Sequence, residues 1–150
     1  MAVAAIKWEA AWVSRGTVLT TELNSLASGA FSALGPAYDN TTNLDQMAAI
    51  DFVLATFDPT TVPPSLALFM AQSLDGTNYE DAPSATNVGS HMRVLSLNVL
   101  DTSSAKRIIT PRFWIPPGKV KFALYQLCGV AFNASGSTGT LYTTNDEVQS

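Results

Sequence analysis

The acidic residues that could carry chemistry collect in one stretch, "LDGTNYED", at residues 74–81. A calcium-binding loop places oxygen ligands at alternating positions and closes with a bidentate carboxylate. The carboxylates that follow Asp75 are the adjacent Glu80 and Asp81, so this spacing does not match. An Asp-Gly pair accepts the positive φ of a tight hairpin turn, and Asn78 can bond its own backbone. The stretch therefore predicts a turn and no metal site.

The side chains most often used as nucleophiles, bases and soft metal ligands are scarce, since the chain has one histidine, His91, and one cysteine, Cys128. A catalytic triad or a histidine metal site would need distant partners for His91, and no nucleophile motif flanks it. Cys128 lies in the apolar stretch "LYQLCGVAF", which has no basic residue to lower the pKa of a thiol. No phosphate loop, dinucleotide fingerprint or metalloprotease helix occurs. These observations predict no enzyme activity and no cofactor.

Composition and length favour a single β domain over residues 1–150. Hydrophobic residues make up 47% of the chain and charged residues 13%, against about 25% charged in an ordinary soluble domain. Ser, Thr and Asn supply the missing polarity in runs such as "DNTTN" and "NASGSTGT", which suit turns and hydroxyl-rich strand faces. The lone cysteine excludes an internal disulfide, so packing must stabilise the fold.

Charge patterning gives no sign of a nucleic acid or membrane partner. The net charge is −4, and the eight Lys and Arg are scattered, whereas nucleic acid and anionic membrane surfaces require clustered basic residues. No apolar run approaches the ~20 residues that cross a bilayer. The first residues, "MAVAAIKWEAAWV", lack a basic region ahead of an apolar stretch, so no signal peptide is predicted and synthesis in a cytoplasm is expected.

Short apolar stretches alternate in the two-residue period of a half-buried strand. Four are the clearest strands: "AAIDFVLATF", "SLALFMAQS", "HMRVLSLNVL" and "KVKFALYQL". In the first, Ile50, Phe52 and Leu54 share a face opposite Asp51. Proline-bearing segments such as "DPTTVPPS" and "WIPPGK" must be connections, because proline cannot donate to a strand ladder. The pattern predicts an all-β fold of seven or eight strands, a single antiparallel β-sandwich of jelly-roll type.

One short helix and a frayed C-terminus complete the expected architecture. Leu19, Leu23 and Leu26 recur at helical spacing, with Thr20 or Thr21 as the N-cap and Gly29 as the stop. The C-terminal residues 145–150 are expected to fray.

The N-terminal residues 1–14 carry an apolar stripe. In an extended chain Ile6, Trp8 and Trp12 point to one side, and in a helix Trp8 and Trp12 also meet, four residues apart. The stripe predicts a protein-contacting arm built on these three residues. An ordinary first strand packed in the domain's own core is the alternative.

Three phrases occur in order over most of residues 12–147: "TELNSLASGAFSALGPAYDN", "SLDGTNYED" and "RFWIPPGKVKFALYQLCGVAFNASGSTGTLYTTNDE". Their "LNSLA", "AYDN", "DGTNY" and "IPPGKVKF" segments make the chain resemble small virion structural proteins of tailed bacteriophages. It departs from them where Gln126, Leu127 and Cys128 stand in place of an Asn before a Gly. A further departure is Gly136-Ser137, which replaces a "GN" turn, and both blur any shared contact at that end.

The resemblance implies a compact β-sandwich, often a jelly roll, that decorates or cements the phage head or joins the tail, with no enzyme activity. It implies a virion location, with the major capsid protein or tail proteins as partners, and self-association as a homotrimer, in keeping with the closed symmetry of most homo-oligomers. The high apolar content suits a subunit that buries much of its surface. A carbohydrate-binding module for host sugars is the alternative, because exposed aromatic side chains can stack on sugars.

Overall fold

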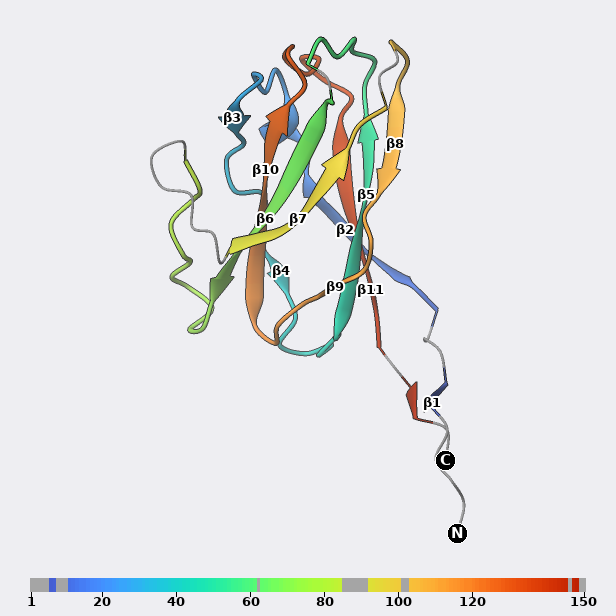
Figure 1. The fold of residues 1–150 in the computed structure, drawn as a ribbon. Helices are drawn as coiled ribbons and strands as arrows, with labels where there is room; N and C mark the ends of the chain where they lie inside the picture. The colour runs from blue at the N-terminus through green and yellow to red at the C-terminus, as the bar shows by residue number, and fades with distance from the viewer. Residues whose placement is uncertain are drawn as a thin grey trace.

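The computed structural model describes residues 6–7, 11–61, 63–84, 92–100, 103–145 and 147–148, with the backbone alone for 6–7 and 147–148. In this part of the chain the regular structure is almost entirely β. Figure 1 shows two antiparallel sheets lying against each other in a two-layered, sandwich-like arrangement. A ribbon of β1 (Ile6–Lys7) and β12 (Glu147–Val148) extends away from them.

The two main sheets each contain five strands. Sheet I has the order β3-β10-β6-β7, with β4 also paired to β10; its strands are β3 (Ala30–Phe31), β4 (Tyr38–Asp39), β6 (Ser65–Ser73), β7 (Arg93–Asn98) and β10 (Lys119–Leu127). Sheet II has the order β2-β11-β5-β8, with β9 also paired to β5; its strands are β2 (Val13–Leu19), β5 (Met47–Leu54), β8 (Lys106–Ile109), β9 (Phe113–Trp114) and β11 (Thr138–Thr144).

The main core lies between the facing sides of the two sheets. Alternate residues of β5 and β10 point into it and are fully buried, as the two-residue period predicts; these are Ile50, Phe52, Leu54, Val120, Phe122 and Leu124. All four of the clearest predicted strands are confirmed as β5, β6, β7 and β10. The expected all-β fold of antiparallel strands in two layers is therefore met.

Strand β6 is buried on both faces, because the outer side of sheet I carries a second core. Ala67, Phe69 and Ala71 of β6 lie in this cluster. The ring centroid of Phe31 lies 5.2 Å from that of Phe69 and 4.7 Å from that of Tyr125. Within the described residues, the chain thus covers the outer face of sheet I with its own side chains; the others in this cluster are Leu34, Met92 and Ala123.

The expected N-terminal helix is reduced to one turn, the 3-10 helix η1 (Thr21–Leu23). Leu19 ends strand β2, and Thr20 makes no side-chain capping hydrogen bond. Ser25 has a φ of 53°, which turns the backbone away from a helical path. The three leucines at helical spacing are nevertheless buried in the main core. Their spacing therefore indicated burial correctly but did not indicate a helix; the residues are Leu19, Leu23 and Leu26.

Four strands of sheet II were not anticipated from the sequence: β2, β8, β9 and β11. Strand β9 includes Trp114, the first residue of the "WIPPGK" segment that was expected to be a connection. β2 pairs with β11 through two register irregularities, and β11 pairs in regular antiparallel register with β5. The C-terminal stretch expected to fray contains β12, which pairs with β1. Both chain ends therefore leave the main sheets from neighbouring strands, β2 and β11.

Gly35 lies where the two sheets approach each other at an edge. Its N–H donates to the carbonyl of Phe122 in sheet I, 2.9 Å away. A methyl group at its Cα would lie 1.9 Å from the carbonyl oxygen of Val18 in sheet II. Only a residue without a side chain permits this approach, so Gly35 sets the distance between the sheets here.

Replacing Gly35 with alanine should therefore lower the free energy of unfolding by about 3 kcal/mol, because the new methyl group meets backbone and cannot be accommodated by a rotamer change. Urea denaturation of Gly35→Ala measures this loss. Gly29→Ala is the control: its Cβ meets nothing within 4 Å, so it reports backbone strain alone. Equal midpoints for Gly35→Ala and the parent protein would contradict the close approach.

Candidate functional site

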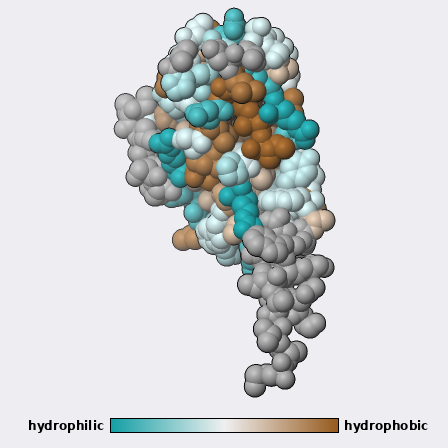
Figure 2. Space-filling view, turned by 45° about the vertical axis from the view of Figure 1, so that its right-hand side comes forward, coloured by the Kyte–Doolittle hydropathy of each residue, from teal (hydrophilic) through white to brown (hydrophobic). Residues whose placement is uncertain are grey.

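Sheet II presents a partly apolar outer surface. Figure 2 brings this side forward and shows hydrophobic residues gathered in its middle with hydrophilic residues around them. The exposed large hydrophobic residues of the described chain are Trp12, Val13, Leu44, Val53, Leu74, Leu100, Ile109, Trp114 and Leu127. Scattered single exposures are ordinary, but groups of them mark interaction surfaces.

Five of these residues belong to one end of the molecule. Strand register places this end in both sheets: Trp114 pairs with Met47 and Val13 with Thr143 in sheet II, and Ser73 pairs with Lys119 in sheet I. We call its exposed hydrophobic residues the apolar end: Trp12, Val13, Leu44, Leu74 and Trp114. The side chains of Leu74 and Leu44 are 100% and 58% exposed, and Trp114 is 56% exposed. Such side chains gain most from being covered by a partner.

A buried carboxylate, Asp45, holds this end together. Arg15 donates from Nε to Oδ2 and from Nη2 to Oδ1, each over 3.0 Å. The hydroxyls of Tyr38 and Thr143 also donate to Oδ2. We call these four residues the Asp45 latch; they come from β2, β4, β11 and the segment before β5, so the latch joins both sheets.

Asn40 extends the latch through its amide group. It is fully buried, and its Nδ2 donates to the carbonyls of Asp45 and Pro116 over 2.8 and 3.0 Å. Its Oδ1 accepts from the backbone N–H of Asp45 over 2.8 Å. The "AYDN" phrase thus connects the loop before β5 to the segment that leads into β10.

The latch keeps one anion and one neutral phenol in contact. Burial by itself raises the pKa of Asp45, but hydrogen bonds from Tyr38 and Thr143 and the charge of Arg15 outweigh it, and the pKa is lowered. Burial raises the pKa of Tyr38, and the hydrogen bond to Asp45 adds to the effect. Asp45 therefore stays ionised and Tyr38 stays protonated through the neutral range.

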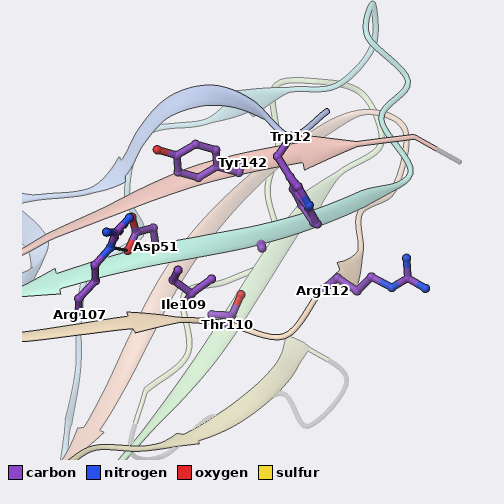
Figure 3. A pocket seen from close by; sticks show the side chains of 8 residues that line it. Trp12, Asp51, Arg107, Ile109, Thr110, Arg112 and Tyr142 are labelled. Carbon is purple, nitrogen blue, oxygen red and sulfur yellow. Dashed lines mark hydrogen bonds and ion pairs between the residues drawn. The ribbon is translucent and has the colours of Figure 1, made fainter. Parts of the chain in front are cut away.

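A hollow of about 360 Å³ lies on the outer face of sheet II, beside the apolar end. Figure 3 shows Tyr142, Trp12, Thr110 and Ile109 around it, with Asp51 and Arg107 together on one side. Strands β5, β8 and β11 supply most of the lining, and residues 110 and 112 follow β8. The lining residues are Trp12, Ala49, Asp51, Arg107, Ile109, Thr110, Arg112 and Tyr142.

The polar side of the hollow is a bidentate ion pair. Arg107 Nε lies 3.0 and 3.1 Å from the two carboxylate oxygens of Asp51, and Nη2 lies 2.7 Å from Oδ2. The Asp51 side chain is 12% exposed and that of Arg107 is 66% exposed. The hydrogen bond and charge of Asp51 raise the pKa of Arg107. The pair is geometrically fixed and reachable from solvent.

Of the residues expected in a protein-contacting arm, the structure describes the side chain of one. Trp12 is 38% exposed and belongs both to the apolar end and to the hollow. Ile6 lies in β1, where the backbone alone is described, and Trp8 lies outside the described residues. The contact predicted for these three residues stays a prediction.

The "LDGTNYED" stretch forms a turn, as predicted from its residues. Asp75 Oδ1 accepts from the backbone N–H groups of Thr77 and Asn78 and from the Ser73 hydroxyl. Gly76 has a φ of +75°. The backbone hydrogen bonds from Asn78 and Thr77 hold the pKa of Asp75 well below its usual range. Donors of the turn itself thus occupy this carboxylate.

Of the other candidates for chemistry, the structure describes Cys128 alone. Cys128 is buried, and burial raises the pKa of its thiol, which disfavours a reactive thiolate. His91 lies outside the described residues. Among the residues that are described, no group of three or more His, Cys, Asp or Glu could hold a metal ion. Likewise, no helix in the described part has the length and hydrophobicity to span a membrane.

Sequence reasoning named Trp12 of the hollow but missed the residue pairs that build the latch and the ion pair. Asp45 and Arg15 are 30 positions apart, and Asp51 and Arg107 are 56 apart. The available signal was modest: Asp51 was recognised as facing away from Ile50 and Phe52 of the same strand. Its partner could not be named without the strand pairing.

Comparison with protein-family models, with curated proteins and with solved structures finds no match.

Substituting Asp45 with asparagine should lower the free energy of unfolding by about 3 kcal/mol at neutral pH. The amide would leave Arg15 without its anionic partner and would place an NH₂ group against hydroxyl donors. Thermal or urea denaturation measures the loss. Asp39→Asn is the control, since Asp39 lies at the same end but is exposed, and it should change stability far less. A similar loss in both variants would contradict the role of the latch.

The latch should also make the free energy of unfolding depend on pH in the acidic range. The folded-state pKa of Asp45 lies below its ordinary value, so its contribution is present above the unfolded-state pKa of about 3.9. It is lost as pH falls through the folded-state value. The stability gap between the parent protein and Asp45→Asn should therefore narrow below about pH 4. Urea midpoints measured from pH 7 to lower pH would show this, and a constant gap would contradict it.

Proposed function

We propose that the chain is a non-enzymatic structural protein of a tailed-phage virion, a capsid decoration or cement protein that binds the major capsid protein. The resemblance of its ordered phrases to small virion proteins supports this proposal. The apolar end supplies the surface for the contact. Burial raises the pKa of the Cys128 thiol and disfavours its use as a nucleophile, which is consistent with a non-enzymatic role.

We also propose that the sandwich is a jelly roll, and the strand order supports it. The chain behaves as one long antiparallel ribbon folded over: β2 pairs with β11, β3 and β4 with β10, β5 with β8, and β6 with β7. Folding brings β11 beside β5 and β10 beside β6, so that the chain crosses repeatedly from one sheet to the other, except between β3 and β4, between β6 and β7, and between β8 and β9. Two interlocked four-stranded keys of this kind define the jelly roll.

The apolar end is the observation that carries the proposed contact. The chain covers the outer face of sheet I with its own side chains, whereas Leu74, Leu44 and Trp114 stay more than half exposed. The Asp45 latch fixes the loop that carries Leu44, so little ordering cost would oppose docking. Trp12 lies at the same end, and the N-terminal residues before it would extend the contact, including Ile6 and Trp8.

The assembled form of this proposal is a homotrimer on the head surface, in line with the closed symmetry of most homo-oligomers. A tail-associated structural protein is the nearest alternative, and the two differ in copy number. Densitometry of purified virions should find the protein at a level comparable to the major capsid protein. A scarce component confined to tails would contradict the head assignment.

Removing two side chains of the apolar end should release the protein from particles. The double variant Leu74→Ser, Trp114→Ser loses two apolar contacts worth about 3 kcal/mol together, or about a hundredfold in affinity. Co-sedimentation with virions stripped of the protein measures binding. Leu100→Ser is the control, because Leu100 is 73% exposed but outside the apolar end. Unchanged binding of the double variant, with its melting temperature preserved, would contradict the proposed contact.

A further inference from the structure

The hollow on sheet II combines two kinds of lining on opposite sides. Figure 3 shows the rings of Trp12 and Tyr142 on the β11 side, and Ile109 with Thr110 on the β8 side. The Asp51–Arg107 pair closes one end. A ligand here would meet apolar surface over most of its faces and fixed polar groups at one edge.

The faces of the two aromatic rings suit a ligand that has one flat apolar face and a polar edge. Tyr and Trp present an apolar body with a polar tip, and they pack against flat apolar groups without losing much rotamer freedom. A pyranose ring has such a flat face, made of C–H groups, and a rim of hydroxyls. Ala49 and Ile109 add small and branched apolar surface to the lining.

The polar groups can serve hydroxyls as both donors and acceptors. The Asp51 carboxylate accepts, and Arg107 uses Nε and Nη2 for Asp51, which leaves Nη1 as a further donor. Thr110 Oγ1 accepts from the Ile50 N–H over 2.9 Å, so its hydroxyl hydrogen can be donated. A sugar hydroxyl, which donates and accepts at once, can bond each of these groups.

The paired charges disfavour ionic ligands, and the polar edge disfavours wholly apolar ones. Asp51 and Arg107 neutralise each other at one end of the hollow, so neither a cation nor an anion gains a net opposite charge there. A wholly apolar ligand would strip water from the ion pair and return no hydrogen bond. A volume of about 360 Å³ is at the lower end of the range for small-molecule sites, roughly 300–1,000 Å³. That size suits one or two sugar rings.

We propose that this hollow is a binding site for a neutral pyranose sugar, with Trp12 and Tyr142 packing on the ring face and Asp51, Arg107 and Thr110 bonding its hydroxyls. The site is a ligand-binding activity beyond the structural role proposed above and does not depend on it. Trp12 belongs to both surfaces, so particle binding is tested through Leu74 and Trp114 of the apolar end, which do not line the hollow.

The test uses the full chain, labelled with ¹⁵N and titrated with glucose, galactose, mannose, N-acetylglucosamine, lactose and cellobiose. At least one sugar should shift the Trp12 indole signal and the amide signals of Ile109 and Tyr142 with saturation, while the Trp114 indole signal stays in place. Trp12→Ala and Arg107→Gln should each weaken binding at least tenfold. Both positions are exposed, and unchanged amide spectra elsewhere would establish that these variants fold.

Three results would overturn the proposal. The first is that no sugar in this panel shifts the Trp12 indole signal at millimolar concentration. The second is an equal shift in Trp12→Ala at Ile109 and Tyr142. The third is a saturable response at these residues to calcium or inorganic phosphate but to none of the sugars, which would assign the hollow to an ionic ligand. Particle binding is measured with other variants, so either idea can fail without the other.

Discussion

The ionised carboxylate of Asp45 is the interaction on which the geometry of the apolar end depends. A charge at that depth is costly unless it is paired and hydrogen-bonded, and Arg15, Tyr38 and Thr143 together meet the requirement. Because these partners come from both sheets, satisfying the carboxylate also fixes how the sheets meet. The loop bearing Leu44 and the start of β2 beside Trp12 are positioned as a consequence.

The outer face of sheet I is covered by the chain's own side chains, whereas that of sheet II is partly open to solvent. Sheet I carries a second core in which Phe31, Phe69 and Tyr125 pack together, so its outer face is satisfied within the chain. The outer face of sheet II instead carries an ion pair, aromatic rings and a hollow. The first arrangement stabilises the fold, and the second leaves chemistry available to a ligand. This difference, with the exposed residues of the apolar end, is the basis of both proposals.

Prediction from the sequence succeeded where burial follows a simple period. Strands β5, β6 and β10 alternate or remain apolar throughout, and the inward residues of β5 are those expected. It failed for β2 and β11, since glycine and threonine interrupt their apolar pattern and their pairing depends on neighbours far along the chain. The leucines at 19, 23 and 26 suggested a helix, yet the same spacing is compatible with a strand end, a single turn and a loop that all face one core. Tertiary packing overrode local propensity there.

The sequence alone determined what depends on residues close together in the chain. The Asp75 turn follows from an Asp-Gly pair and an asparagine within a few positions, and the scarcity of His and Cys follows from composition. The tertiary structure decided which distant residues meet, Arg15 with Asp45 and Arg107 with Asp51, and it placed Trp12 and Tyr142 along the same hollow. The physical reason is that a turn satisfies its hydrogen bonds locally, whereas a buried charge or an open sheet face acquires its partners only when strand order and register bring them into contact.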